Sequence, residues 1–177
     1  MQLAGANGAG KTSLLRIIAG FSMPDEGDIL YLNQSIKKYY EEYARDLLFI
    51  GHKTGVNVQL SALENVKHWL AINGYTNEGD LYPLLSKLGL VGLEDVPVRT
   101  LSAGQQRRVA LARLWLSEAK LWILDEPFTA LDKSGVAFLQ QRFVEHLKNG
   151  GAILLTTHQD LTAHFRNLQT LTLEYRH

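Results

Sequence analysis

Short runs of apolar residues that end at a glycine or a polar residue recur along the chain. Residues 47–50 and 121–124 are apolar throughout. Such runs are typical of strands that are buried on both faces of a parallel sheet. Weaker patterns of the same kind predict further strands at residues 1–4, 28–32, 152–156 and 168–173, with a turn at Asn33-Gln34.

Segments with apolar side chains at helical spacing lie between the predicted strands. Residues 11–19 show this spacing, and Gly20 is placed to end the helix. Ser61 and Glu64 have the spacing of a capping box, which predicts the start of a helix that runs to about Ile72. The same periodicity predicts helices at residues 81–88, 105–116 and 134–148.

This order of strands and helices predicts an α/β fold with a mostly parallel sheet that helices cover on both faces. Residues 52–117 interrupt the alternation because predicted helices dominate them. We therefore expect a single domain over residues 1–177. Its core would consist of residues 1–51 and 118–177, with residues 52–117 inserted as a helical subdomain.

Composition narrows the class of protein. The 177 residues include 18 basic and 18 acidic side chains, so the net charge is zero and no basic field draws the chain to nucleic acid. No apolar run approaches the roughly 20 residues that span a bilayer, and the first residues lack the pattern of a signal peptide. The absence of cysteine excludes disulfides, thiolate metal sites and cysteine nucleophiles. These features predict a neutral domain that faces the cytosol.

A glycine-rich segment, residues 5–12, matches the pattern glycine, four residues, glycine, lysine, then serine or threonine. Its glycines allow successive N–H groups to face one concavity, and the following helix adds the positive end of its dipole. Lys11 is predicted to reach the β- and γ-phosphates of ATP, and Thr12 to coordinate Mg²⁺. An ordinary turn with a solvated lysine is the alternative, but the flanking strand and helix favour a phosphate-binding loop (P-loop). The predicted nucleotide-binding residues of this loop are Gly5, Ala6, Asn7, Gly8, Ala9, Gly10, Lys11, Thr12 and Ser13.

An apolar strand that ends in two acids supplies the second half of such a site. Asp125 follows residues 121–124 and is predicted to hold Mg²⁺. Glu126 comes next, and we expect it to orient or deprotonate the attacking water. Without a P-loop upstream, the two acids would indicate only a solvated strand end. With it, the sequence predicts a P-loop NTPase of the RecA-like kind that binds ATP and Mg²⁺.

Residues 101–108, Leu-Ser-Ala-Gly-Gln-Gln-Arg-Arg, resemble the signature motif of ABC ATPases, commonly written LSGGQ. Ala103 replaces the first glycine of that motif. By itself the segment is a helix N-terminus with a serine cap and small residues that let a phosphate approach. The resemblance implies two subunits that face head to tail and sandwich two ATP molecules. Ser102, Gly104 and Gln105 would then contact the nucleotide held by the second ATP-binding subunit.

Further segments follow in the order that ABC ATPases show. Residues 129–132 resemble the D-loop, and His158 resembles the switch histidine that contacts the γ-phosphate, which implies catalytic roles for His158 and Lys11 beside Glu126. His52 stands where the family usually has the glutamine of its Q-loop. Family members also carry antiparallel strands and an adenine-stacking aromatic before the P-loop, where this chain has four residues. We therefore expect exposed sheet edges and weak contacts to the base.

A narrower resemblance rests on longer runs, which are residues 49–53, 60–65, 98–116, 121–132 and 156–159. It relates the chain to the ATP-binding subunits of the bacterial cytochrome c maturation system, the heme exporter ATP-binding proteins. The resemblance implies a peripheral protein on the cytoplasmic side of the cell inner membrane, bound to integral membrane subunits of that ABC complex. It also implies that ATP energy serves to deliver heme or to release a heme-loaded chaperone.

A heme site is not expected on this chain itself. The chain has no cysteine, and its histidines on predicted helices are expected to have surface or packing roles. The protein would therefore interact with heme only indirectly, through the membrane subunits. The tryptophans are expected to pack in the core or the subdomain. The residues concerned are His68, His146 and His164, and Trp69, Trp115 and Trp122.

Other functions are compatible with the same motifs. One is the ATP-binding subunit of a different ABC exporter. Another is a soluble ABC ATPase of translation or DNA repair, which typically joins two cassettes or adds coiled coils and needs basic surfaces. This chain has one cassette and zero net charge, which argues against that class. A regulator that only binds ATP is disfavoured because Lys11, Asp125, Glu126 and His158 are all present.

Overall fold

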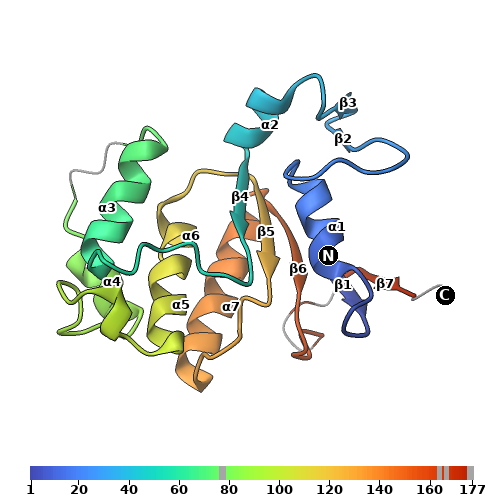
Figure 1. The fold of residues 1–177 in the computed structure, drawn as a ribbon. Helices are drawn as coiled ribbons and strands as arrows, with labels where there is room; N and C mark the ends of the chain where they lie inside the picture. The colour runs from blue at the N-terminus through green and yellow to red at the C-terminus, as the bar shows by residue number, and fades with distance from the viewer. Residues whose placement is uncertain (76–78, 163–164, 166–167, 175–177) are drawn as a thin grey trace. The chain divides into compact units, whose positions relative to one another are not determined.

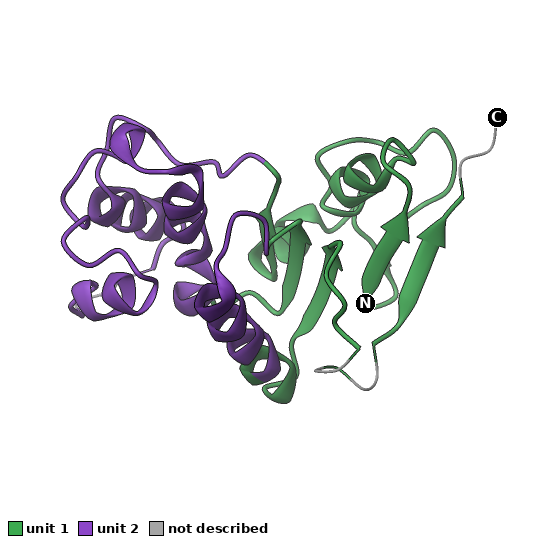
Figure 2. Ribbon diagram, turned by 90° about the horizontal axis from the view of Figure 1, so that it is seen from below, with its two compact units in different colours: residues 1–52, 118–127, 145–177 green, residues 53–117, 128–144 purple. Residues whose placement is uncertain are grey.

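The structure is a computed structural model that describes residues 1–75, 79–162, 165 and 168–174. His164 therefore lies outside the described residues. The chain divides into two compact units, which Figure 2 distinguishes by colour. The first unit contains residues 1–52, 118–127 and 145–177, and the second unit contains residues 53–117 and 128–144.

A five-stranded sheet forms the centre of the first unit (Figure 1). Its strands are β1 (Gln2–Gly5), β4 (Leu47–Ile50), β5 (Leu121–Asp125), β6 (Ala152–Thr156) and β7 (Thr170–Leu173). They lie in the order β4-β5-β6-β1-β7, and every neighbouring pair is parallel. The predicted parallel sheet is thus confirmed, and the N-terminal strand lies between the two C-terminal strands.

Helix α1, Lys11–Ile18, follows β1 and packs against this sheet. Leu3, Leu15 and Ile123 form a buried cluster with it, each no more than 1% exposed. Burying a leucine or isoleucine side chain contributes about 1.5–3 kcal/mol. The cluster therefore fixes α1 against β1, which the glycine-rich loop follows, and β5, at whose end the two predicted acids lie.

A small antiparallel hairpin in the first unit corrects a predicted turn. Strand β2, Leu30–Tyr31, pairs with β3, Gln34–Ser35. Leu32 and Asn33, between them, have φ angles of 50° and 63°. Two-residue hairpin turns of type I′ need positive φ at both central positions. The turn therefore lies at Leu32-Asn33, and the prediction that placed it one residue later was wrong. Helix α2, Tyr40–Arg45, follows the hairpin.

Helices make up most of the second unit. They are α3 (Ala62–Ile72), α4 (Tyr82–Lys87), α5 (Ala103–Leu111) and α6 (Arg113–Leu116), with a 3₁₀ turn at Val98–Thr100. Helix α7, Lys133–Lys148, begins in this unit, and its last residues from 145 belong to the first. Within the part of the chain that the structure describes, none of the helices combines the length and the apolar character needed to cross a membrane.

Two predicted helices of this unit had different outcomes. The capping box of α3 is confirmed, because Ser61 Oγ accepts from Glu64 N–H at 3.1 Å and Glu64 Oε2 accepts from Ser61 N–H at 2.7 Å. The helix predicted at residues 105–116 is confirmed as helical, but it begins earlier and is divided into two. Ser102 is an N-cap, so α5 starts at Ala103, and the Trp115 N–H donates to the carbonyl of Ala112, three residues back, at 3.1 Å. This 3₁₀-type bond separates α5 from α6.

The aromatic side chains pack as expected. In the first unit the rings of Trp122 and His146 stack with their centroids 3.6 Å apart. In the second unit Trp69 and Trp115 pack against aromatic neighbours. The predicted packing roles of the tryptophans and of His146 are therefore confirmed, and His68 is exposed on α3.

Candidate active site

Three glycines with positive φ shape the loop between β1 and α1. Gly5, Gly8 and Gly10 have φ angles of 144°, 84° and 90°, which residues with a side chain rarely adopt. A Cβ at Gly5 would also lie 2.7 Å from the carbonyl oxygen of Leu173 in β7. A Cβ at Gly8 or Gly10 would meet nothing within 4 Å, so at these two positions the backbone angle alone favours glycine.

Lys11 is held over this loop by the loop's own carbonyl groups. Its ammonium donates to the carbonyl of Gly5 at 2.7 Å and to that of Ala6 at 3.0 Å. The Ala9 N–H donates to the same carbonyl of Ala6 at 3.2 Å, which closes the loop on itself. A positive charge thus lies where the loop would receive a phosphate group.

The N-terminus of α1 faces the same place. Its N-cap is Gly10, and no side chain among the described residues caps the helix. The first N–H groups of a helix have no partner inside the helix, and together with the helix dipole they attract anions. Since glycine offers no side-chain oxygen, these donors stay available to a phosphate.

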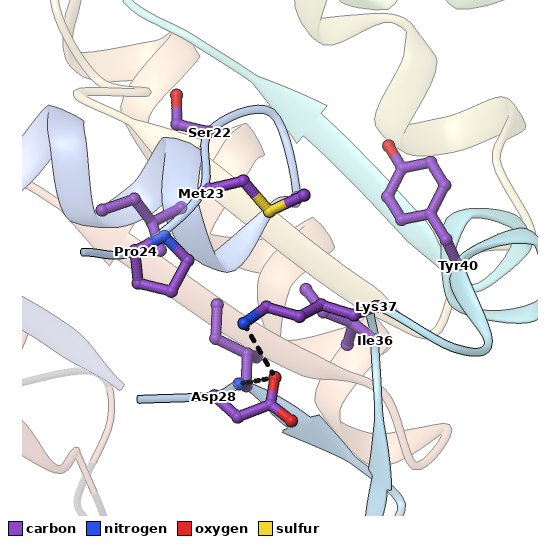
Figure 3. A pocket seen from close by; sticks show the side chains of 10 residues that line it. Ser22, Met23, Pro24, Asp28, Ile36, Lys37 and Tyr40 are labelled. Atoms are coloured by element: carbon purple, nitrogen blue, oxygen red, sulfur yellow. Dashed lines mark hydrogen bonds and ion pairs between the residues drawn. The ribbon is translucent and has the colours of Figure 1, made fainter. Parts of the chain in front are cut away.

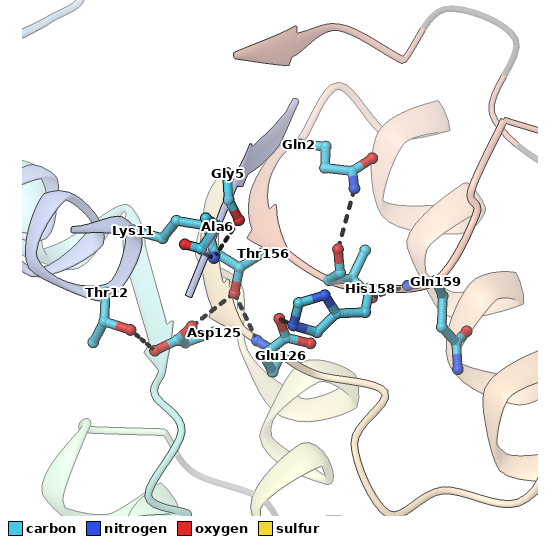
Figure 4. Close-up of polar contacts among 11 residues, drawn as sticks. Gln2, Gly5, Ala6, Lys11, Thr12, Asp125, Glu126, Thr156, His158 and Gln159 are labelled. Atoms are coloured by element: carbon cyan, nitrogen blue, oxygen red, sulfur yellow. Dashed lines mark hydrogen bonds and ion pairs between the residues drawn. The ribbon is translucent and has the colours of Figure 1, made fainter. Parts of the chain in front are cut away.

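The carboxylate of Asp125 is held from two sides at the end of β5 (Figure 4). Thr12 Oγ1 donates to Asp125 Oδ2 at 2.9 Å, and Thr156 Oγ1 donates to Asp125 Oδ1 at 2.7 Å. Asp125 is only 3% exposed. These bonds orient both oxygens of the predicted magnesium ligand and join it to the first turn of α1.

Glu126 leaves the sheet in a left-handed backbone conformation, with a φ of 51°. This conformation costs a residue with a side chain roughly 1–2 kcal/mol, and strain of this kind clusters at active sites. The Glu126 N–H donates to Thr156 Oγ1 at 2.9 Å, and Glu126 Oε1 lies 3.4 Å from His158 Nε2. The Glu126 side chain is 19% exposed and that of His158 70% exposed, so the acid is sheltered and the histidine reaches solvent.

These side chains meet in one pocket of about 420 Å³ that belongs wholly to the first unit. The structure thus brings together residues predicted to bind phosphate, to hold the metal and to activate water. Gly5, Ala6 and Ala9 belong to the same loop but do not line the pocket. The lining consists of Asn7, Gly8, Gly10, Lys11, Thr12, Ser13, His52, Asp125, Glu126 and His158.

The donors in this pocket fit a magnesium ion that is shared with a nucleotide. Mg²⁺ usually binds proteins through one or two carboxylates, and waters and phosphate oxygens complete its octahedron. Asp125 offers a carboxylate, and Thr12 a hydroxyl next to it. Across the described residues, no group of three acidic, histidine or cysteine side chains forms a metal site made by the protein alone. Thr12 and Asp125 are therefore the candidate protein ligands.

Thr156 is a site residue that the sequence pattern does not single out. It is buried behind the pocket and contacts both acids. The sequence places it next to Thr157 and His158 at the end of an apolar run, but nothing in that run says which threonine faces Asp125. The strand register decides this, because Thr156 is the partner of Asp125 in the parallel pair of β5 and β6.

The signature residues belong to the second unit. Ser102 Oγ accepts from the Gln105 N–H at 3.3 Å, and Gln105 Oε1 accepts from the Ser102 N–H at 2.9 Å, which forms a capping box. Gly104 lies so close to the carbonyl of Ala130 that a Cβ there would clash with it. Gly104 therefore has a packing role that the sequence did not indicate, since it lets α5 start against the predicted D-loop.

Asp132 in the predicted D-loop connects the start of α7 to α5 within the second unit. Its Oδ1 accepts from the Gly135 N–H at 2.8 Å and lies 2.7 Å from Arg108 Nη2. Arg108 also donates to the carbonyl of Leu88 at 2.8 Å. The Gly135 N–H, the Ser134 hydroxyl and the Arg108 guanidinium hold the pKa of the Asp132 carboxyl below its ordinary value. The D-loop and the signature helix are thus tied together.

A second pocket in the first unit has a different character (Figure 3). Its volume is about 250 Å³, and apolar side chains such as Met23 line much of it. The Asp28 carboxylate accepts from the Ile29 N–H at 2.9 Å and lies 3.9 Å from the Lys37 ammonium. Because these charged groups pair with each other, the P-loop pocket is the stronger candidate for catalysis.

Comparison with known proteins decides the family. A family model described as ABC transporter matches residues 1–129. The cytochrome c biogenesis ATP-binding export protein CcmA of Aliivibrio fischeri is 55% identical over 173 residues, which cover 98% of this chain and 85% of that protein. The protein of the same name from Vibrio cholerae is 52% identical over 174 residues, which cover 98% and 84%. The chain belongs to the ABC transporter family and, within it, to the cytochrome c biogenesis ATP-binding export proteins.

Solved structures agree with this assignment. A structure described as the ATP binding subunit of an ABC transporter matches with a TM-score of 0.84 and 28% sequence identity. The match covers 97% of this chain and 73% of the chain in that structure. A dimeric post-hydrolysis state of the ATP-binding cassette MJ0796 has a TM-score of 0.81 at 24% identity, covering 98% and 80%, and shows the shared fold. The predicted P-loop NTPase fold and the predicted resemblance are confirmed, and the protein is an ABC-type ATPase that binds ATP.

Proposed function

We propose that this protein is the ATP-hydrolysing subunit of a membrane complex of c-type cytochrome biogenesis. ATP turnover in that complex would power the delivery of heme or the release of a heme-loaded chaperone. The observation that carries the proposal is the 55% identity, over 98% of the chain, to a cytochrome c biogenesis ATP-binding export protein. The P-loop pocket supports the part of the proposal that concerns hydrolysis.

The phosphates of ATP bind to the loop of residues 5–12. The N–H groups of this loop and of the first turn of α1 donate to phosphate oxygens, since no side chain among the described residues caps that turn. Lys11, which rests on the carbonyls of Gly5 and Ala6, neutralises charge on the β- and γ-phosphates. The loop therefore positions the γ-phosphate at the side of the pocket where Asp125 and Glu126 lie.

Thr12 and Asp125 are the residues that would hold Mg²⁺. When bound there, the ion would supply electrostatic stabilisation of the charge that develops on the transferred phosphoryl group. The Thr12–Asp125 hydrogen bond of 2.9 Å keeps the two side chains directed at the same part of the pocket.

Glu126 orients or deprotonates the attacking water, a role that general bases fill with contributions of about 10²–10⁴-fold. His158, with Nε2 at 3.4 Å from Glu126 Oε1, contacts the γ-phosphate and steadies the glutamate. His52 lines the same pocket at the position of the Q-loop. An imidazole there serves as a contact to water or to a partner better than as a ligand of magnesium.

Partner subunits complete the machine. A second ATP-binding subunit pairs head to tail with this one, so that Ser102, Gly104 and Gln105 contact the nucleotide that the second subunit holds. Two of the similar structures are described as dimeric cassettes, which supports a second ATP-binding subunit. The further partners are integral membrane subunits of the cytochrome c maturation complex, to which the protein binds on the cytoplasmic side of the inner membrane.

Affinity purification from detergent-solubilised membranes tests the proposal. The complete protein should recover integral membrane subunits of cytochrome c maturation, and addition of ATP with Glu126→Gln should strengthen the pairing of ATP-binding subunits. Recovery of a sugar or peptide permease would show that the cytochrome assignment is wrong while the ATPase activity stands. Recovery of ribosomes or nucleic acid without membrane subunits would favour the soluble class instead.

A further inference from the structure

Thr156 lies between two neighbouring strands of the sheet, and the reaction proposed above gives it no role. It is the last residue of β6, and the register pairs it with Asp125 of β5 on one side and with Leu3 of β1 on the other. Its side chain is fully buried, at 0% exposed. Side chains at paired positions of neighbouring strands point to the same face, so the hydroxyl lies beside the Asp125 carboxylate (Figure 4).

The contacts of the Thr156 hydroxyl decide where its single proton points. The Glu126 N–H can only donate, so Thr156 Oγ1 accepts there, at 2.9 Å. The hydroxyl proton is then directed to Asp125 Oδ1, at 2.7 Å. The hydrogen bonds therefore run in one direction, from the Glu126 backbone through the hydroxyl to the Asp125 carboxylate.

For Asp125, this hydroxyl completes a two-sided support. Thr12 donates to Oδ2 and Thr156 to Oδ1, so rotation of the carboxylate about its Cβ–Cγ bond would break both bonds. A hydrogen bond to a charged group in a buried position is worth more than one between neutral groups. Thr156 thus helps to fix the plane in which Asp125 presents its oxygens.

For Glu126, the same hydroxyl supports an uncommon backbone conformation. Residues with a side chain seldom adopt the positive φ of 51° found here, so the conformation needs support from its surroundings. The bond from the Glu126 N–H to Thr156 holds the peptide group that links the two acids. A change at Thr156 would therefore disturb the direction in which the Glu126 side chain leaves the sheet.

We propose that Thr156 is a positioning residue that sets Asp125 and Glu126 for ATP hydrolysis through one hydroxyl group. The inference rests on the magnesium and water-activating roles proposed above for the two acids. It predicts that loss of the hydroxyl weakens turnover and metal-dependent nucleotide binding. Metal-free nucleotide binding, which the P-loop governs, should change little.

Thr156→Val in the complete protein tests this, because valine keeps the size of the side chain and removes the hydroxyl. We expect kcat to fall about tenfold, which corresponds to about 1.4 kcal/mol, while KM for ATP in the presence of Mg²⁺ rises by only about threefold. A fluorescent ATP analogue, titrated with and without Mg²⁺, should show that the gain in affinity caused by the metal shrinks by about threefold or more. Thr156→Ser, which restores the hydroxyl, should return both readings towards the wild type.

Thr157→Val is the matched control. The Thr157 hydroxyl accepts from the Gln159 N–H at 3.0 Å, and this bond does not involve either acid. The same substitution one residue further along should therefore leave kcat and the effect of Mg²⁺ unchanged. A loss equal to that of Thr156→Val would show a general effect of the strand end and overturn the inference.

Wild-type kcat and a wild-type effect of Mg²⁺ in Thr156→Val would also overturn it, provided that Glu126→Gln is inactive in the same assay. If Glu126→Gln turns over normally as well, the proposed role of Glu126 itself is wrong. An equal loss of metal-free and metal-dependent binding would reduce Thr156 to a structural residue. If a melting curve shows that Thr156→Val is unfolded, Thr156→Cys against Thr157→Cys decides instead, and wild-type kcat in the former refutes the proposal.

Discussion

The two units use the N-terminus of a helix in opposite ways. In the first unit α1 begins at Gly10, and no side chain among the described residues caps it. In the second unit α5 begins at Ser102, whose hydroxyl and N–H are both engaged with Gln105. One helix start keeps its donors for a ligand, whereas the other satisfies part of them within the chain.

The difference separates stability from binding. A capped helix start is typically about 1 kcal/mol more stable than an uncapped one. The N-terminus of α5 therefore needs no ligand to stabilise it. The start of α1 lacks this contribution, and the helix depends on its buried Leu15 to hold it in place. We infer that the first unit gives up local stability for phosphate binding, and that the second unit presents a preformed surface.

The largest effect should come from Glu126, the acid in the first unit that is proposed to act on water. Glu126→Gln keeps the shape of the side chain but removes its basicity, so turnover should fall by about a thousandfold, while ATP binding stays near that of the wild type. Phosphate release and nucleotide titration measure the two quantities. Glu41→Gln, at an exposed acid in the first turn of α2, is the control and should be active. Near-normal turnover of Glu126→Gln would show that Glu126 does not activate the attacking water.

A smaller effect should follow if α1 receives a cap of its own. Asparagine tolerates the left-handed angles found at Gly10, and the position has room for a side chain. In Gly10→Asn the new carboxamide can accept from the first-turn N–H groups, and ATP affinity should fall about fivefold because a cap is worth about 1 kcal/mol.

Gly27→Asn is the control for this change, since Gly27 has a φ of 85° and equally open space but does not start a helix. Its ATP affinity should match that of the wild type. Unchanged affinity in Gly10→Asn would show that the uncapped donors are not what phosphate uses.

The smallest effect concerns the capped helix of the second unit. Ser102→Ala should cost about 1 kcal/mol, which lowers Tm by about 2–4 °C in a chain of this length. Ser61→Ala removes the matching capping box of α3 and should cost the same. Only Ser102→Ala should also lower ATP turnover, because only Ser102 is proposed to meet the nucleotide of a second subunit. Equal turnover in the two variants would leave Ser102 with a purely structural role.

The fold was predictable where the signal is local. The apolar runs give β4 and β6 with their observed bounds, and Ser61 and Glu64 mark the start of α3. Helix α2 was not predicted because its six residues are mostly polar or aromatic, without an apolar stripe at helical spacing. The division between α5 and α6 depends on one 3₁₀-type bond, which apolar periodicity cannot distinguish from a continuous helix.

The candidate site follows the same rule. The lining of the P-loop pocket consists of residues that short motifs indicate, since each motif carries its chemistry within a few neighbouring positions. Thr156 and the packing role of Gly104 were not predictable in this way. The contact of Thr156 with Asp125 spans 31 residues of sequence, and the contact of Gly104 with Ala130 links α5 to a separate loop. Such contacts come from register and packing.

The place of β1 in the sheet has a consequence for how the protein is made. The phosphate loop follows the first strand, yet in the sheet that strand lies between β6 and β7 and pairs with residues 155–156 and 170–173. While the ribosome is still synthesising the middle of the chain, β1 has neither of these neighbours. Partners so distant in sequence also slow folding, because a long loop must close before the pairing forms. The nascent chain therefore completes the sheet around its phosphate loop only after residues 152–173 have been synthesised.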